Sequence, residues 1–251
     1  MNKMGIVIKT NEQIGVMRRA GRITALTHEH LANYIRPGIT TGDISKIAED
    51  FIRSYDGSPS FLGYRGFPAA VCTSVNSEVI HGIPGKYKLK NGDIISIDIG
   101  VCYKRYHCDA ARTHAVGKIT AKHKTLIEAT QACFFRGMEF ARAKGRLHDI
   151  SDALENYIDE YGFSMVREWC GHGIGRQLHE DPQIPHTRQE KRGPRLEAGM
   201  TLAIEPMVNA GTNKLNIKND TWTVVTQDGE YSAHYENTVL ITDGEPEILT
   251  L

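Results

Sequence analysis

The chain has 251 residues, of which 40% are hydrophobic, and its 30 basic and 30 acidic side chains give a formal net charge of zero at pH 7. This composition is typical of a globular protein that is large enough to bury a substantial core. The balanced charge argues against direct recognition of nucleic acid through a basic surface. The sequence has no apolar run near the roughly 20 residues that a membrane helix needs, so no membrane association is expected.

The start of the chain and the cysteines both bear on the cellular compartment. The segment Met1 to Lys9 has no apolar region of the length found in signal peptides. The five cysteines are odd in number, scattered, and form no Cys-x-x-Cys pair, which argues against a disulfide framework or a thiolate zinc site. A cytoplasmic location is therefore expected.

Two helices are predicted at the start of the chain. Thr10-Asn-Glu-Gln13 has the pattern of a capping box, and the helix that it opens should continue to about Ile35, before Pro37-Gly38. A second helix should follow Thr41-Gly-Asp43, because apolar residues recur at helical spacing from Ile44 to Tyr55. Both helices should pack one face against a core.

Residues 91–113 predict a β-hairpin, with a β-branched strand from Ile94 to Val101 followed by a polar turn. Pairing Asp98 with Asp109 centres the turn between Tyr103 and Lys104 and places the two carboxylates opposite each other, with Cβ atoms roughly 5 Å apart. Because bare carboxylates at that separation repel each other, a metal ion between them is the first candidate. The alternative is that Asp98 ends its strand and Asp109 faces solvent.

The second half of the chain repeats the first. Asp43-Ile-Ser45 and the helical pattern around it recur at Asp149-Ile-Ser151, and the strand Leu89–Asp98 recurs at Leu196–Glu205. The two offsets, 106 and 107 positions, agree across separate elements, which indicates an internal duplication. We expect a single domain over residues 1–251 with pseudo-repeats at about 10–116 and 120–245, each made of two helices followed by antiparallel strands. Pairing of the halves about a pseudo-twofold axis would bring Asp98 and Glu205 to equivalent central positions.

Further candidate ligands follow in the second half. Cys170-Gly-His172-Gly-Ile-Gly175 presents one imidazole in a glycine-rich segment that lacks both the dinucleotide and the Walker phosphate-binding patterns. Residues 222–226 and 234–241 should pair as strands around Asp228-Gly229, with Glu236 in an apolar strand. One imidazole and four carboxylates suit Mn, Fe(II), Co or Zn, and four carboxylates favour two ions with shared ligands.

Seven short motifs, in order over nearly the whole chain, together resemble type I methionine aminopeptidases. They are His81-Gly-Ile-Pro, Ser96-Ile-Asp98-Ile-Gly, His107-Cys-Asp109-Ala-Ala-Arg-Thr, Gly171-His172-Gly-Ile-Gly, His179-Glu-Asp-Pro, Ile204-Glu205-Pro and Glu236-Asn-Thr. The resemblance implies an α+β, pita-bread fold, whose two helix-helix-strand halves agree with the repeat.

The resemblance also implies the site. It assigns two divalent metal ions (Co, Mn, Fe(II) or Zn), with room for a monovalent cation elsewhere, and it makes Asp109 and Glu236 the bridging ligands. The implied metal ligands are Asp98, Asp109, His172, Glu205 and Glu236. A metal-activated hydroxide is expected to attack the first peptide bond, with Glu205 as the proton shuttle. His179 would stabilise the oxyanion, and His81 would contact the scissile amide nitrogen or the free amine. The apolar pocket for methionine would be formed by Tyr64, Phe67, Cys72 and Trp222.

The expected activity is removal of the N-terminal methionine from nascent proteins and peptides whose second residue is small. The implied partners are nascent polypeptide N-termini at the ribosome, and a monomer is expected. Four residues depart from the family pattern: Arg65 stands where many relatives carry His, Cys108 and Thr221 where Gly is usual, and Leu178 where an aromatic residue is usual. They bear on the pocket's shape, the preferred substrate and sensitivity to oxidation.

Three other functions compete with this one. A proline-directed peptidase of the same fold would carry a large extra N-terminal domain, for which the chain has no room. A catalytically dead relative that acts as a binding module would lack metal ligands, whereas all five are present. A glycosidase with a pair of carboxylates would not explain His81, His172 and His179.

Overall fold

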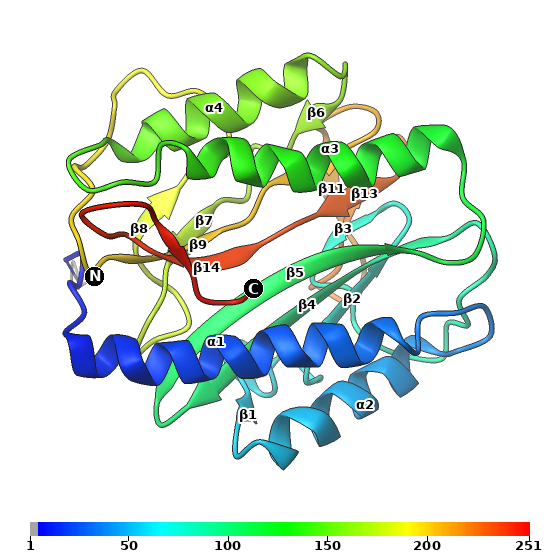
Figure 1. Ribbon diagram of the computed structural model, residues 1–251. Coiled ribbons are helices and arrows are strands. Elements are labelled where there is room, and N and C mark those ends of the chain that lie inside the picture. Colours follow the sequence, from blue (N-terminus) through cyan, green and yellow to red (C-terminus); the bar gives the residue numbers. More distant parts are fainter. Residues whose placement is uncertain (1–4) are drawn as a thin grey trace.

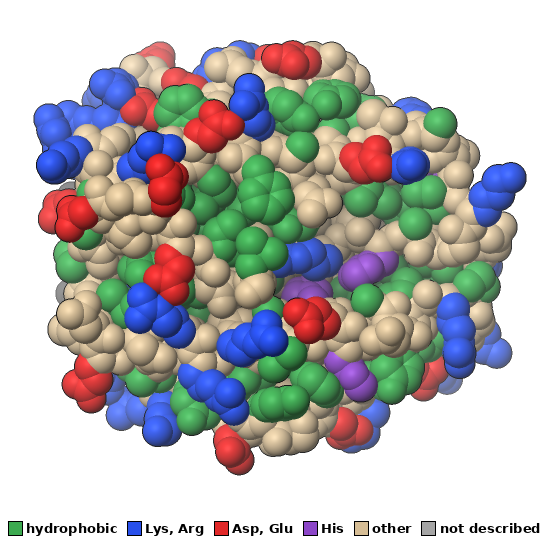
Figure 2. All heavy atoms as spheres, in the orientation of Figure 1, with side chains coloured by type: hydrophobic (Ala, Val, Ile, Leu, Met, Phe, Trp, Pro, Cys, Tyr) green, Lys and Arg blue, Asp and Glu red, His purple; other side chains and the backbone are tan. Residues whose placement is uncertain are grey.

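The computed structural model describes residues 5–251, so the expectation for the first four residues of the N-terminal segment lies outside the described part. Two pairs of helices flank the strands, α1 with α2 on one side and α3 with α4 on the other (Figure 1). Basic and acidic side chains are interspersed over the face seen in Figure 2. The helices are α1 (Asn11–Ala32), α2 (Thr41–Ser54), α3 (Ala121–Met138) and α4 (Leu147–Asp159), with a 3₁₀ turn η1 (Tyr64–Gly66).

The strands form four antiparallel groups. In the first half, β4 lies between β1 and β2 and also pairs with β5; the largest group, of five strands in the order β15-β14-β9-β7-β8, belongs to the second half. Two smaller groups have the orders β13-β10-β6 and β11-β12-β3. The bounds are β1 (Ser58–Pro59), β2 (Cys72–Val75), β3 (Glu78–Ile80), β4 (Ile94–Tyr103), β5 (Tyr106–Ala115), β6 (Ser164–Met165), β7 (Gly171–Gly173), β8 (Glu180–Ile184), β9 (Thr201–Ile204), β10 (Met207–Asn209), β11 (Leu215–Ile217), β12 (Val224–Thr226), β13 (Ser232–His234), β14 (Asn237–Leu240) and β15 (Glu247–Ile248).

Helix α1 begins as its sequence predicts, whereas α2 begins at Thr41, capped by Thr40, and not after Thr41-Gly-Asp43 as expected. The Thr10 hydroxyl accepts from the Gln13 amide, and the Gln13 side chain accepts from the Thr10 amide in return. Helix α1 ends at Ala32, short of the expected Ile35, because the Asn33 side chain donates to two carbonyls of the last turn, those of Glu29 and His30. None of the helices within residues 5–251 combines the length and apolar character needed to cross a bilayer.

The β4–β5 hairpin forms, but its expected register is wrong by two residues. Asp98 lies opposite Ala111 and Asp109 opposite Gly100, so the turn is Lys104-Arg105. Both turn residues have positive φ, 45° and 70°, as in the tight turns that match the twist of a hairpin. Because side chains alternate with a period of two, this shift leaves both carboxylates on the same face, as diagonal rather than direct neighbours.

The strand pair expected around Asp228-Gly229 is also wrong. Strand β12 pairs with β11 and β3, whereas β13 pairs with β10 and β14 pairs with β9 and β15. The Asp228 side chain instead accepts hydrogen bonds from the Thr212 and Glu230 amides, which fixes the connection between the two groups. The expected strand 234–241 is also split, since β13 ends at His234 and β14 begins at Asn237, so Glu236 lies between two strands and their partners come from other parts of the chain.

Equivalent backbone contacts recur in the two halves. Thr40 forms an isolated bridge with Lys88, and Arg146 forms the corresponding bridge with Arg195. The neighbouring bonds repeat as well: the Leu89 amide donates to the Ile39 carbonyl and the Leu196 amide to the Gly145 carbonyl, at 2.9 and 3.0 Å. An internal duplication predicts this equivalence, because each half ties the start of its second helix to the segment before the strand that carries or precedes its acidic residue, β4 or β9.

A short backbone contact joins the two halves. The Ala111 amide donates to the Glu236 carbonyl at 3.3 Å, and the Glu236 amide donates to the Ala111 carbonyl at 3.0 Å. The Thr113 hydroxyl adds bonds to both the amide and the carbonyl of His234. This contact places the strand that carries Asp109 beside Glu236.

Candidate metal centre and peptide-binding cleft

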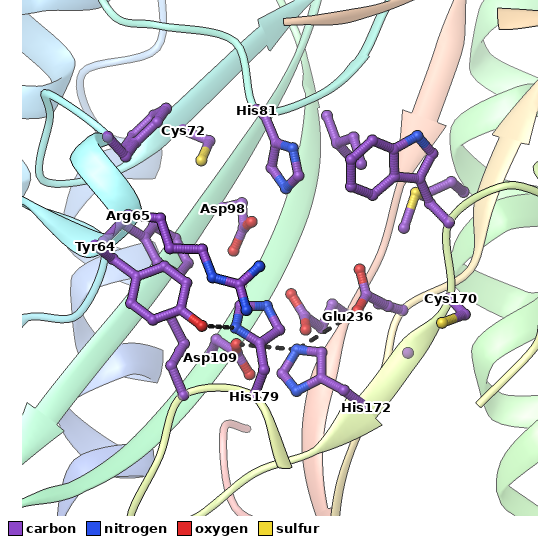
Figure 3. Close-up of a pocket in the computed structure, with 18 of the residues that line it drawn as sticks. Tyr64, Arg65, Cys72, His81, Asp98, Asp109, Cys170, His172, His179 and Glu236 are labelled. Atoms are coloured by element: carbon purple, nitrogen blue, oxygen red, sulfur yellow. Dashed lines mark hydrogen bonds and ion pairs between the residues drawn. The ribbon is translucent and has the colours of Figure 1, made fainter. Parts of the chain in front are cut away.

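A cleft of about 840 Å³ lies between the halves and contains every residue that the sequence predicts for the site. Its walls come from both halves of the chain, as the close-up in Figure 3 shows. The predicted residues that line it are Tyr64, Phe67, Cys72, His81, Asp98, Asp109, His172, His179, Glu205, Trp222 and Glu236. Strands β4 and β5 supply two of its carboxylates, and the segments around β7, β9 and β14 supply the imidazole and the other two.

Potential metal ligands gather at the base of the cleft. Asp109, His172 and Glu236 are buried and each offers a ligand atom, all within 4.8 Å of one another. Nε2 of His172 lies 3.7 Å from Oδ2 of Asp109 and 3.6 Å from Oε1 of Glu205. An imidazole and several carboxylates converging at these distances are a donor set that suits a divalent ion.

Protein groups do little to offset the burial and mutual repulsion of the carboxylates at the base. Burial raises the pKa of Asp98, Glu205 and Glu236 well above the usual range, and repulsion by neighbouring carboxylates, Asp109 among them, raises it further. Oδ1 of Asp98 is buried and has no hydrogen-bond partner among the described residues. Cations bound here would offset both the burial and the repulsion, so the residues present fit a metal centre.

His172 is oriented as a metal ligand would be. Its Nδ1 lies 2.9 Å from the Gly173 carbonyl, so Nδ1–H donates to that oxygen and leaves the Nε2 lone pair facing the carboxylates. The glycines on either side allow neighbouring strands to approach. A Cβ atom on Gly171 would lie 2.4 Å from the Ala203 carbonyl oxygen, and one on Gly173 would lie 2.1 Å from that of Asp181.

Three further residues support the centre and were not assigned a role by the sequence. The Thr238 hydroxyl accepts from the Asp109 amide and donates to the Asp109 carbonyl, each at 3.0 Å. Arg112 donates to the Glu236 carbonyl and, at 2.6 Å, to Oδ1 of Asn237. Both residues belong to the Asp109 and Glu236 motifs, so their positions in those motifs were the available signal.

His234 is the third. It is buried, and its Nε2 lies 3.7 Å from Oε2 of Glu205. Burial lowers its pKa to about 3, so the ring is neutral. A histidine two positions before Glu236, in a segment that otherwise reads as a buried strand, was the signal for it.

The apolar end of the cleft is built from aromatic rings. Phe67 and Trp222 meet edge to face with centroids 5.1 Å apart, and His81 stands edge-on to Trp169 at 5.0 Å. Cys72 and Leu178 are buried beside them. Burial lowers the pKa of His81 to about 4, so its imidazole is neutral at pH 7. Trp169 was not predicted, and its position directly before the glycine-rich segment that begins at Cys170 was the available signal.

His179 lies at the opening of the cleft. Its ring stacks on Tyr64 with centroids 5.2 Å apart, and Nδ1 is 2.9 Å from the Tyr64 hydroxyl (Figure 3). Partial burial, with the nearby His172 and Arg65, lowers the pKa of His179 to about 3. The imidazole is therefore neutral at pH 7 and can donate only one hydrogen bond.

The structure shows where each of the four departures from the family pattern lies. Arg65 and Thr221 have φ values of 50° and 65°, in the region that favours glycine, and both line the cleft. Leu178 is buried in the wall. Cys108 is fully buried, its Sγ donates to the Met17 carbonyl, and burial raises the pKa of the thiol, which does not fit the expected sensitivity to oxidation at this position.

A profile of Metallopeptidase family M24 matches residues 15–243. The chain belongs to metallopeptidase family M24. Its M24 relatives include the methionine aminopeptidase of Clostridium perfringens (strain 13 / Type A), which is 52% identical over 98% of this chain and 99% of its own length. Methionine aminopeptidase 1 of Bacillus subtilis (strain 168) is 51% identical, with the same two coverages.

Solved structures agree with this membership. The crystal structure of methionine aminopeptidase from Rickettsia prowazekii superposes with a TM-score of 0.96 at 38% identity, covering 98% of this chain and 100% of that one. Prolidase from Pyrococcus furiosus, at 23% identity and a TM-score of 0.78, shares the fold; the match covers 98% of this M24 chain and 65% of that chain. The expected pita-bread fold is confirmed, and an M24 metallopeptidase is a metal-dependent hydrolase.

Proposed function

We propose that this M24 chain removes the N-terminal methionine from peptides and nascent proteins whose second residue is small. The observation that carries the proposal is the arrangement of the cleft, where Asp109, His172 and Glu236 meet beside an apolar pocket. The names of the M24 relatives at about 50% identity support the same activity. Residues 1–251 would act as a single catalytic domain with its two pseudo-repeats on either side of the cleft.

Two divalent ions would occupy the site, held by Asp98, Asp109, His172, Glu205 and Glu236, with Asp109 and Glu236 shared between them. Mn, Fe(II), Co and Zn all suit these donors. When bound, such ions lower the pKa of water toward neutrality and so supply a hydroxide nucleophile. A monovalent cation would bind elsewhere in the fold.

The protein's own groups would position the substrate and handle protons. Glu205, at the base of the cleft, accepts the proton of the attacking water and passes it to the leaving amine. His179 donates a hydrogen bond from Nε2 to the developing oxyanion. His81, held edge-on to two indole rings, contacts the scissile nitrogen or the free amine.

The substrate's methionine side chain would enter the apolar end of the cleft, against Tyr64, Phe67, Cys72 and Trp222. Burial of an unbranched thioether against aromatic rings is favourable, since sulfur and aromatic rings attract each other. A bulky second side chain would meet the rim before the scissile carbonyl reached the metal centre, and a misplacement of about 1 Å can cost roughly 10²-fold in rate.

The partners would be nascent N-termini at the ribosome, in the cytoplasm, without direct nucleic-acid recognition. The enzyme would act as a monomer, because both halves of the site come from one chain.

Hydrolysis of short peptides tests the proposal. Met-Ala-Ser should be cleaved after its first residue, whereas Met-Leu-Ser, Ala-Ala-Ser and the X-Pro peptide Ala-Pro-Ser should be poor substrates. Removal of metal should abolish turnover, and Mn, Fe(II), Co or Zn should restore it to different extents. Faster cleavage of Ala-Pro-Ser than of Met-Ala-Ser would favour a proline-directed peptidase instead.

A further inference from the structure

The cleft contains one lysine or arginine side chain, that of Arg65, among the residues that the structure describes. The guanidinium carbon of Arg65 lies 5.4 Å from the centroid of the Tyr64 ring. Within residues 5–251, Arg65 forms no ion pair. The side chain is exposed, so its donors are available to a ligand in the cleft.

The backbone defines where this side chain leaves the main chain. Arg65 has φ of 50° inside the tight turn η1, flanked by Gly63 and Gly66 with φ of 80° and 91°. Two backbone bonds close the turn: the Gly63 amide donates to the Phe67 carbonyl, and the Phe67 amide donates to the Tyr64 carbonyl. A non-glycine residue in this region is strained and is held there only where its surroundings dictate the conformation. The guanidinium is therefore presented from a rigid turn rather than from a loose loop.

The position of Arg65 along a bound substrate follows from the two ends of the cleft. Methionine enters the buried aromatic end and the scissile bond lies at the metal ligands, so the rest of the peptide must leave through the opening. Arg65 lies at that opening, next to Tyr64 and His179, and its guanidinium points over the site in Figure 3. Its charge reaches His179, whose pKa it helps to lower.

Among the described residues, none of the carboxylates that line the cleft forms an ion pair with Arg65. Glu180 is taken up by Lys9 at 2.6 Å. Glu168 belongs to the segment that ends at Cys170, which Figure 3 draws across the cleft from Arg65. The four carboxylates at the base would be balanced by the two divalent ions of the proposed function. Glu168 and the exposed Asp181 also line the cleft, so the opening is not cationic as a whole; what Arg65 offers is a guanidinium that no described carboxylate pairs with.

We infer that Arg65 is a specificity-determining residue that favours substrates with a carboxylate just after the scissile bond. Arginine binds carboxylates through paired hydrogen bonds, and neither an amide nor an ammonium group can replace that partner. The carboxylate has two possible sources: an acidic side chain at the third position of the substrate, or the free C-terminus of a short peptide such as Met-Ala. This inference rests on the proposed function, because it concerns the same peptides.

The test compares isosteric substrates by kcat/KM on the metal-loaded enzyme. Met-Ala-Asp-Ser-amide should be cleaved about threefold to tenfold faster than Met-Ala-Asn-Ser-amide, and Met-Ala-Lys-Ser-amide should be slowest. Added salt should shrink the preference. A second arm compares Met-Ala with Met-Ala-amide, which separates the terminal carboxylate from the side-chain one.

Variants identify the residue responsible. Arg65→Asn, which keeps a side chain tolerant of positive φ, should bring both ratios close to one, whereas Arg65→Lys should retain part of the preference. Arg176→Gln removes an exposed arginine that does not line this cleft and should leave the ratios unchanged.

An Asp-to-Asn ratio near one in the wild type, or a preference that survives in Arg65→Asn, would overturn the inference while leaving the proposed function intact. Failure to cleave any of the Met-Ala peptides would instead overturn the proposed function.

Discussion

The Tyr64 hydroxyl lies 2.9 Å from Nδ1 of His179, and the two rings stack at an angle of 25°. With the pKa of His179 lowered to about 3, the ring is neutral, so a hydroxyl that donates to Nδ1 fixes the proton on Nε2. We expect the Tyr64 hydroxyl to be the donor, which would keep His179 in the tautomer that can donate to an oxyanion.

This arrangement predicts different effects for the two residues. His179→Ala should lower kcat by about 10²–10³-fold, the range found when an oxyanion donor is removed. Tyr64→Phe should lower kcat by about threefold to tenfold, because the orienting bond is lost while the donor remains. Added to His179→Ala, Tyr64→Phe should have little further effect on kcat, and bound metal should stay constant in all three proteins. A large loss of metal in His179→Ala, with normal turnover per bound ion, would instead make His179 a ligand.

Asp109→Ala should abolish turnover and lower the number of bound metal ions. Asp109 is buried and shares its ligand cluster with His172 and Glu236, and the mutation also removes repulsion among the carboxylates of the apo protein. The fold should therefore survive, as judged by circular dichroism. Metal analysis after dialysis and the Met-Ala-Ser assay check the prediction, which an active, fully metallated variant would contradict.

The thiols predict a specific pattern of chemical sensitivity. Cys170 lines the cleft and is half-buried, whereas Cys108 is fully buried. Burial raises the pKa of both thiols, so a maleimide should react slowly, faster at higher pH, and at Cys170 before Cys108. Cys170→Ser should protect activity and Cys108→Ala should not, with peptide mass mapping to locate the adduct. Protection by Cys108→Ala alone would reverse this order.

Lys9 and Glu180 form an ion pair that is almost entirely buried, with side chains 2% and 7% exposed and a separation of 2.6 Å. Burial lowers the pKa of Lys9 more than pairing with Glu180 raises it. The charged form of Lys9 is therefore stabilised in this buried position mainly by Glu180. Lys9→Met should therefore lower the free energy of unfolding by about 3 kcal/mol, since it leaves a buried carboxylate unpaired.

The double variant Lys9→Met/Glu180→Gln should recover part of that loss. Lys46→Met, which removes the exposed partner of Asp50, is the matched control and should change the urea midpoint little. Equal losses in the single and double variants would show that packing of the lysine stem, and not the charge pair, is responsible.

His186 predicts a pH dependence of stability. Its Nε2 accepts from the Gly171 amide, and burial lowers its pKa to about 4. The unfolded chain takes up this proton near pH 6.5 and the folded chain only near 4, so the unfolded state binds more protons in between. Stability from this group is thus complete above about pH 6.5 and falls as the pH drops to about 4, by up to about 3 kcal/mol.

The variant His186→Gln keeps an acceptor for Gly171 and does not titrate. Urea unfolding at pH 7.5 and at pH 5 should show that the wild type loses more stability than the variant does. Parallel losses in the two proteins would assign the pH dependence to other groups.

The sequence was sufficient for the features that repeat or that sit in motifs. One capping box, helical periodicity and the duplication predicted the helices, and the motifs predicted which residues meet in the cleft. The hairpin register could not be predicted, because a shift of two residues leaves every side chain on the same face of the sheet, and the sequence pattern shows only which face a residue occupies. The pairing partners of β12 were not predicted either, because the sequence of a short apolar strand does not specify which distant strand it pairs with.

Contacts between distant side chains were also beyond sequence reasoning. Lys9 and Glu180 are far apart in the sequence, and no sequence pattern around either residue predicts that its charge is buried. His234 and Trp169 acquire their places only when the two halves come together. The roles of the ligands and of His81, His179 and Glu205 remain predictions that the experiments above address.

The backbone bonds between Ala111 and Glu236 have a consequence for how the protein holds together. Candidate ligands on one side of that contact come from the β4–β5 hairpin, and those on the other side come from the second half. Ions bound among them would act as a removable cross-link between two parts of the chain that are far apart in sequence, comparable in effect to a disulfide that closes a long loop. Their binding free energy would add to the free energy of unfolding, so metal supply in the cell would set not only how fast this chain works but how long it lasts.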